Sequence, residues 1–261
     1  MEPQEVLAST VGRVRILTLN RPASLNALTP SMVTLLIEQV AGAVAAPEVG
    51  AIILTGTGRG FCAGADLKES EKRAMAGVDN TPFIRSILRL GSMLEGGPKP
   101  VIGAVNGIAV AGGLELLLAC DFLLAASSAR LGDAHSNYAM FPGGGATMRL
   151  PRRIGLARAK RLMLTGDIWS ADQALEAGLV DAVHPDDALM PEALALADRL
   201  TVKSPLVLAR MKEALTDAVS QSPETALRRE RDLNELHATS FDRAEGLAAF
   251  REKRKPAFQG R

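Results

Sequence analysis

Short apolar runs alternate with longer segments of helical periodicity over the first two thirds of the chain. The apolar runs, which Gly, Asn, Asp or Pro bound, predict strands at 14–19, 50–55, 100–105 and 122–126. Apolar residues at helical spacing predict helices at 30–45, 81–94, 112–120 and 149–164. A short helix and a strand are predicted within 169–183, with Gly178 as the turn. This alternation predicts a layered α/β core with right-handed connections.

Other segments set the boundaries of these elements. Thr29 followed by Pro30 has the form of an N-cap and a first helical residue. The polar, charged stretch 68–80 is expected to be mobile. From about residue 191 the pattern is helical only, so two parts are predicted: a β/α core at 1–195 and a helical C-terminal region at 196–261.

Composition narrows the class of protein. The 261 residues are 47% hydrophobic and 23% charged, which is typical of a soluble globular protein. A net charge of +1 and only 3% aromatic residues argue against a nucleic-acid partner. Cys62 and Cys120 are too few for a disulfide framework and are expected to be small buried hydrophobes in a cytoplasmic protein. Residues 1–5 have no basic or apolar run, so no signal peptide is predicted.

The stretch 100–126 is long and apolar enough to suggest a membrane span. However, Asn106, Glu115 and Asp121 interrupt it, and four glycines punctuate it. Charge at mid-bilayer is costly, so a strand, a turn, a buried helix and a second strand are the better interpretation, and no membrane contact is expected.

Two glycine-rich segments carry the candidate chemistry: Phe61-Cys-Ala-Gly-Ala-Asp-Leu67 and Asn106-Gly-Ile-Ala-Val-Ala-Gly-Gly-Leu-Glu115. Gly112 and Gly113 open a helix directly after a turn, where free N–H groups favour a developing oxyanion. A second backbone donor is plausible at Ala65, where a small side chain leaves the main chain open. The alternatives are close helix packing for the glycine pair and an ordinary loop with small residues for the segment around Ala65.

Glu115 lies in the first turn of this otherwise apolar helix. Burial raises the pKa of a carboxyl group and suits it to proton transfer near neutral pH. The alternative is a capping-box glutamate, which is usually exposed.

His135 lies between glycine-rich loops, two residues after Asp133. In an extended segment the two would share a face, and Asp133 would fix the tautomer of the imidazole. The alternative is a surface histidine or a satisfied core histidine. No cluster has metal-ligand spacing, so no metal is expected, and no serine lies on a nucleophile elbow.

Taken together, the chain resembles the crotonase superfamily, also called the enoyl-CoA hydratase/isomerase family. The resemblance covers nearly the whole chain, and its motifs occur in the family's order. Besides the two glycine-rich segments they are Asn20-Arg-Pro22, Asn26-Ala-Leu28, Pro142-Gly-Gly-Gly145, Leu164-Thr-Gly166, Ala171 to Val180, and Ala249-Phe-Arg-Glu-Lys-Arg-Lys-Pro256.

The resemblance implies a spiral of repeated ββα units with a C-terminal helical trimerisation region. It also implies an acyl-CoA lyase that adds water reversibly to an α,β-unsaturated thioester. Its oxyanion donors would be the N–H groups of Ala65 and Gly112, and Glu115 would activate water. The coenzyme A pocket would comprise Ala63, Gly64, Ala65, Asp66 and Leu67. Phe250 and Lys253 would close or contact this pocket, either in the same subunit or in a neighbouring one. No permanent cofactor is implied, since coenzyme A is part of the substrate, and the expected assembly is a homotrimer or a dimer of trimers.

One position departs from the hydratase pattern. Seven residues before Pro142, where the family's hydratases carry a second glutamate, this chain has His135. A branch that hydrolyses C–C bonds carries histidine here, but also an aspartate where this chain has Gly144. Three functions therefore stay open: hydration, another enolate reaction such as C–C hydrolysis or isomerisation with His135 as the acid or base, and acyl-CoA binding without catalysis.

Overall fold

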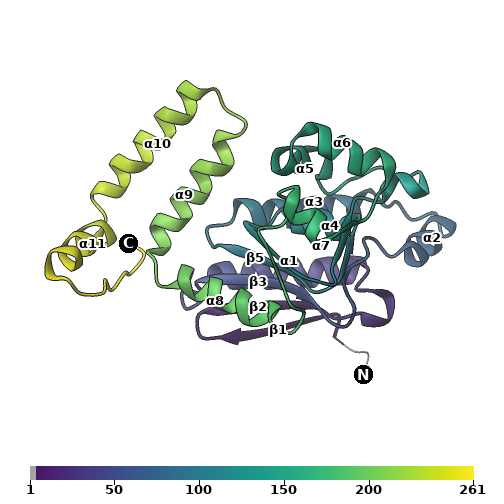
Figure 1. Cartoon of the computed structure of the whole chain (residues 1–261), viewed down its shortest axis with the longest axis horizontal. Helices are drawn as coiled ribbons and strands as arrows, with labels where there is room; N and C mark the ends of the chain where they lie inside the picture. Colours follow the sequence, from purple (N-terminus) through teal and green to yellow (C-terminus); the bar gives the residue numbers. More distant parts are fainter. Residues whose placement is uncertain (1–3) are drawn as a thin grey trace.

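The structure is a computed structural model that describes residues 4–261, and it winds the chain into a spiral of two sheets and their helices (Figure 1). Residues 1–3 lie outside this range, and the prediction that residues 1–5 form no signal peptide falls partly on them. The succession of strands in the two sheets agrees with the spiral of ββα units that the resemblance implies.

The larger sheet has six strands in the order β1-β2-β3-β5-β7-β10, with β1 antiparallel to β2 and the remaining pairs parallel. Their bounds are β1 (Val6–Val11), β2 (Val14–Leu19), β3 (Ala51–Gly56), β5 (Val101–Val105), β7 (Phe122–Ala126) and β10 (Ala182–His184). The smaller sheet has the order β4-β6-β8-β9. Its strands are β4 (Gly60–Cys62), β6 (Ile108–Val110), β8 (Arg130–Gly132) and β9 (Trp169–Ser170).

Each turn of the spiral contributes one strand to each sheet. The pairs β3–β4, β5–β6 and β7–β8 do so in succession, and helices follow each pair. The helices are α1 (Pro30–Ala45), α2 (Leu67–Met75), α3 (Thr81–Gly96), α4 (Gly112–Leu117), α5 (Ala146–Ile154), α6 (Leu156–Thr165), α7 (Ala171–Glu176), α8 (Leu189–Thr201), α9 (Pro205–Ala218), α10 (Pro223–Ala238) and α11 (Phe241–Glu252). Two 3₁₀ turns, η1 (Pro22–Ser24) and η2 (His135–Tyr138), complete the set.

Several predicted elements are confirmed. The strand at 14–19 is β2, and Thr29 caps α1 by accepting a hydrogen bond at Oγ1 from the N–H of Met32 at 3.1 Å. The apolar stretch 100–126 forms β5, β6, the buried α4 and β7. Among the described residues, no helix combines the length and the apolarity needed to cross a membrane.

Three expectations differ from the structure. The stretch 68–80 is helical over most of its length, because Asp66 caps α2 by accepting from the N–H of Glu69. The single helix predicted over 149–164 is two helices, because Gly155, with φ +81°, ends one and starts the other. Strand β6 was not predicted, since three residues beside glycines are too short for a periodic signal.

The C-terminal helices divide between the core and an arm. Helix α8 packs on strands of the larger sheet, whereas α9, α10 and α11 extend away from it (Figure 1). Lys212 of α9 ties the arm to the core through a 2.7 Å ion pair with Asp121. The division between residues 195 and 196 stays a prediction.

Candidate active site

The N–H groups of Ala65 and Gly112 are free and close together. The N–H groups of Ala63 and Asp66 donate to the carbonyls of Leu25 and Leu28, which leaves the N–H of Ala65 without an acceptor among residues 4–261. The N–H of Gly112, at the start of α4, likewise has none within the described chain. A Cβ added to Gly112 would lie 3.6 Å from the nitrogen of Ala65, so the two peptide groups are neighbours.

At the turn before α4 the backbone is strained and packs closely against the segment that contains Cys62. Ala111 has φ +49° and ψ −121°, a conformation that L-residues rarely adopt, and such strain is typical of functional sites. A Cβ on Gly113 would lie only 2.1 Å from the carbonyl oxygen of Cys62, so this position requires glycine. The packing interpretation of the glycine pair is therefore correct for Gly113, while the Gly112 N–H stays available.

Glu115 points into the site from α4 and is only 4% exposed. Its Oε1 accepts hydrogen bonds from the N–H of Gly144 at 2.7 Å and of Ala146 at 3.2 Å. The capping-box alternative is wrong, because these donors belong to the loop before α5 and to the first residue of α5 rather than to the start of α4. With Oε1 held in this way, Oε2 is the oxygen left for chemistry.

His135 and Asp133 form a pair, although not on a strand. Ala134, with φ +57°, turns the chain into η2, so the expected extended segment is wrong. The spacing of two residues still brings the Nδ1 of His135 within 3.0 Å of the Oδ1 of Asp133. Asp133 is buried, and its other carboxylate oxygen has no partner in the described chain.

The charges of this cluster complement one another. Burial raises the pKa of Glu115, against the lowering effect of the Ala146 and Gly144 N–H groups and of His135. Burial lowers the pKa of His135, but the hydrogen bond and charge of Asp133, together with the charge of Glu115, raise it above its usual value overall. The pKa of each group is thus raised, and the charge of each favours the ionised form of the other.

The predicted coenzyme A residues fall at opposite ends of the chain's fold. Residues 63–67 lead into α2, and Arg21 fixes them through a 2.9 Å ion pair with Asp66 and a hydrogen bond to the carbonyl of Ala27. The pKa of Asp66 is lowered because Arg21 and the N–H groups of α2 outweigh its burial. Phe250 and Lys253 lie at the end of α11, on the far side of the molecule from α2 (Figure 1), so one chain does not bring them to residues 63–67.

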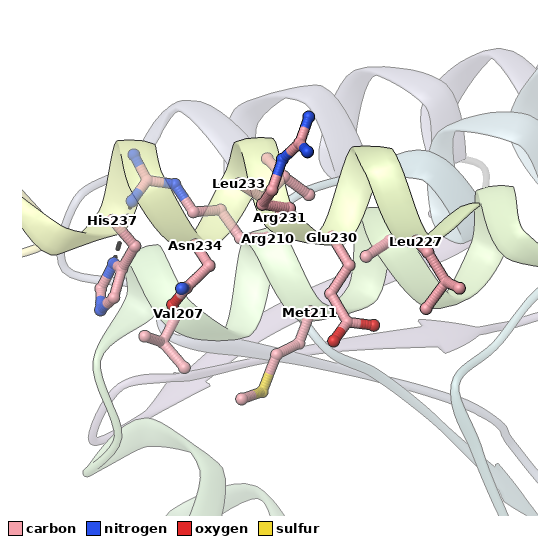
Figure 2. A pocket seen from close by; sticks show the side chains of 10 residues that line it. Val207, Arg210, Met211, Leu227, Glu230, Arg231, Leu233, Asn234 and His237 are labelled. Atoms are coloured by element: carbon pink, nitrogen blue, oxygen red, sulfur yellow. Dashed lines mark hydrogen bonds between the residues drawn. The ribbon is translucent and has the colours of Figure 1, made fainter. Parts of the chain in front are cut away.

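Two cavities bear on where a substrate could bind. One, of about 300 Å³, adjoins Asp133 and His135, and Met140 and Phe141 line it together with side chains of α5 and α6. The other, of about 420 Å³, lies between α9 and α10 (Figure 2). Figure 2 shows Met211, Val207 and Leu227 lining it, with His237 bonded to Arg210 at one end. This second cavity is in the arm, away from Glu115.

Sequence reasoning missed one buried ion pair near the site. Arg149 of α5 binds Glu95 of α3 at 2.9 Å and is 4% exposed. The signal was available, because Arg149 precedes the apolar Leu150 on a helix that must face the core. Cys62 and Cys120 are buried free thiols, as expected, and burial raises the pKa of each to about 12. Within residues 4–261, no group of three His, Cys, Asp or Glu side chains is placed to hold a metal.

The spiral of two sheets and the site at the start of α4 define a crotonase-type protein. The sequence profile of the enoyl-CoA hydratase/isomerase family matches residues 10–261, and the chain belongs to this family. A 2,3-dehydroadipyl-CoA hydratase of Escherichia coli strain K12 is 38% identical over 98% of this chain and 99% of its own. A crotonyl-CoA hydratase of Syntrophomonas wolfei is 35% identical over 99% of both chains.

Solved structures of enoyl-CoA hydratases have the same fold as this chain. An enoyl-CoA hydratase from Bacillus anthracis has a TM-score of 0.93 at 38% identity, covering 99% of this chain and all of its own. One from Geobacillus kaustophilus has a TM-score of 0.91 at 39% identity, covering all of both chains. The chain is therefore an enzyme of the enoyl-CoA hydratase-like type.

Proposed function

We propose that the protein hydrates an α,β-unsaturated acyl-CoA reversibly, through an enolate held by the amides of Ala65 and Gly112. The observation that carries this proposal is the pair of free, adjacent N–H groups beside a buried carboxylate. Two such donors stabilise negative charge on a thioester oxygen most strongly as it develops in the transition state.

Glu115 and His135 share the proton transfers. The Oε2 of Glu115 takes a proton from water as the water oxygen bonds to Cβ, and the electron pair of the double bond moves toward the thioester oxygen. Protonated His135 then gives its proton to Cα, so the atoms of one water are added. Proton exchange afterwards restores both residues. Asp133 orients His135 through Nδ1 and supports its positive charge.

Gly144 favours hydration over C–C hydrolysis. A Cβ at this position would lie 2.7 Å from the Oε2 of Glu115 and 2.9 Å from the Cγ2 of Ile87. The aspartate that the C–C hydrolases carry here would therefore displace Glu115. Replacing His135 by Glu separates the two reactions, because improved hydration supports a hydratase and the loss of a native C–C cleavage supports the alternative.

The decisive experiment follows the loss of enoyl thioester absorbance with crotonyl-CoA. Wild-type enzyme should turn over, and Glu115→Gln should lose about 10²–10⁴-fold in kcat while still binding a CoA ester. The matched control, Glu213→Gln in the exposed arm, should retain activity. Full activity in Glu115→Gln would refute the assigned role. Tight binding of a thioester panel with no turnover by the wild type would instead support a non-catalytic acyl-CoA binder.

The acyl chain beyond Cβ is proposed to occupy the cavity beside His135. Its lining by Met140 and Phe141 suits an apolar chain longer than crotonyl. A substrate panel should therefore include crotonyl-CoA and longer apolar enoyl-CoAs. The substrate that the Escherichia coli relative's name gives, 2,3-dehydroadipyl-CoA, ends in a carboxylate and serves as the charged comparison. No permanently bound cofactor takes part in this scheme.

Phe250 and Lys253 are proposed to reach the coenzyme A site of a neighbouring subunit. Apolar side chains more than half exposed follow the arm, which favours self-association: Met211, Leu215, Val219, Leu227 and Leu236. We propose that these helices form a homotrimer, alone or paired into a dimer of trimers. Sedimentation equilibrium tests this proposal, since a monomer of 27.5 kDa would contradict it.

A further inference from the structure

The buried side chain of Arg149 is connected to Glu115 through the backbone of a single residue, Gly144. The Nη1 of Arg149 donates to the carbonyl oxygen of Gly144 at 2.7 Å. The N–H of the same residue, Gly144, donates to the Oε1 of Glu115 at 2.7 Å. Gly144 therefore joins the arginine of α5 to the carboxylate of α4.

The other side of the guanidinium is fixed to a third helix. The Nε and Nη2 of Arg149 both donate to the Oε2 of Glu95, at 3.0 and 2.9 Å. A charged, two-donor contact of this kind constrains direction as well as distance. Helix α3 thus sets the position of Arg149, and Arg149 sets the position of the loop that holds Glu115.

Glycines make room for this guanidinium. A Cβ on Gly145 would lie 2.3 Å from the Nη1 of Arg149, and a Cβ on Gly91 of α3 would lie 3.1 Å from it. The loop at Gly144 and Gly145 has no side chains with which to hold itself in place. A clamp from outside the loop is therefore what can keep its N–H groups aimed at one carboxylate oxygen.

We propose that Arg149 is a positioning residue for Glu115, acting through the peptide groups of Gly144 and Ala146. This inference rests on the proposed hydration, in which the Oε2 of Glu115 must face the attacking water. Within residues 4–261, the side-chain hydrogen bonds of Arg149 go to Glu95 and Gly144, and none goes to Glu115 or to the free amides. Its loss should therefore lower kcat and leave KM nearly unchanged.

Helix α5 supplies a matched control. Arg153, four residues later, binds the carbonyl of Leu179 at 2.6 Å and the carboxylate of Asp181 at 3.1 Å, and contacts neither Gly144 nor Glu95. Arg149→Met and Arg153→Met make the same chemical change on one helix. Both remove ionic contacts that stabilise the fold, but only the first releases the loop.

The test compares kcat and KM with crotonyl-CoA for both variants, normalised to the folded fraction from circular dichroism. Arg149→Met should lose about 10²-fold in kcat, the scale expected when a catalytic group is displaced, while Arg153→Met stays close to wild type. Arg149→Lys, which cannot bind Gly144 and Glu95 together in the same geometry, should fall between them and serves if Arg149→Met does not fold. Equal losses for Arg149→Met and Arg153→Met, or an unchanged kcat in Arg149→Met, would overturn the proposal.

A second readout does not need the reaction. The carboxyl ¹³C signal of Glu115, assigned by its loss in Glu115→Gln, reports its pKa. The Gly144 and Ala146 N–H groups lower that pKa, and the charged groups that face Glu115 are His135 and Asp133. Releasing the loop should therefore raise the pKa in Arg149→Met but not in Arg153→Met. An unchanged Glu115 titration in Arg149→Met would contradict the positioning role. If the pKa rises in this variant but the wild-type enzyme does not hydrate enoyl-CoA, only the proposed reaction is contradicted.

Discussion

The core and the C-terminal arm use helices in opposite ways. All six residues of α4, which carries Gly112 and Glu115, are buried, whereas every residue of α9 is at least partly exposed. In the core, a polar group is held by several partners in a dry surrounding, which fixes geometry and shifts pKa values. In the arm, apolar side chains face outward and have no covering within one chain. Chemistry is thus expected from the fold of one subunit, and assembly from the arm.

Glycine-to-alanine changes in the core and in the arm should differ most in their effects on activity and stability. Gly144→Ala should cost about 10²-fold in kcat, because its Cβ would lie 2.7 Å from the Oε2 of Glu115. Gly246→Ala in α11, whose Cβ would meet nothing closer than 3.8 Å, should keep activity and gain about 1 kcal/mol in unfolding free energy. Steady-state kinetics and denaturant titration measure the two effects. Similar losses of activity in both variants would remove the contrast between the core and the arm.

A charge placed on the arm should act on assembly first. Leu227→Glu puts a carboxylate on a side chain that is 67% exposed and lines the cavity between α9 and α10 (Figure 2). We expect sedimentation to show dissociation, with the monomer still folded by circular dichroism. The apparent KM for the CoA ester should rise several-fold if Phe250 and Lys253 act across subunits. An unaltered oligomer would locate the interface elsewhere.

The pH profile tests the core alone. In the proposed mechanism, activity requires ionised Glu115 and protonated His135, so kcat/KM should fall below the raised pKa of the first and above the raised pKa of the second. Asp133 raises the pKa of His135, and Asp133→Asn should therefore move the alkaline limb to lower pH. The acid limb should move less, because the charge of Asp133 is the smallest of the effects on the pKa of Glu115. Movement of the acid limb alone would contradict the assignment.

The smallest effect is expected at the thiols. Burial raises the pKa of Cys62 and Cys120 to about 12, so little thiolate forms near neutral pH. Iodoacetamide should leave activity unchanged and label neither cysteine in the folded protein. Labelling in guanidinium chloride is the positive control. Rapid labelling of the native enzyme would show that the core opens readily.

The sequence pattern alone correctly predicted those elements that depend only on neighbouring residues. The strand at 14–19 and the cap at Thr29 depend on neighbouring residues alone, and both are confirmed. The break at Gly155 and the short β6 were not predicted, because a left-handed glycine and a three-residue strand leave little trace in periodicity. For the site, the spacing of Asp133 and His135 predicted their pairing correctly but for the wrong backbone conformation.

The sequence by itself determined the family, the two glycine-rich segments and the identity of the candidate acid and base, because these are properties of residue type and order. Tertiary structure decided which amides stay free, which oxygen of Glu115 is held, and that Arg149 reaches Gly144. Those facts depend on where α3, α4 and α5 meet. The contacts of Glu115 with Gly144 and of Arg149 with Glu95 join residues 29 and 54 positions apart, and contacts at such separations leave no local pattern, so only the packed fold can specify them.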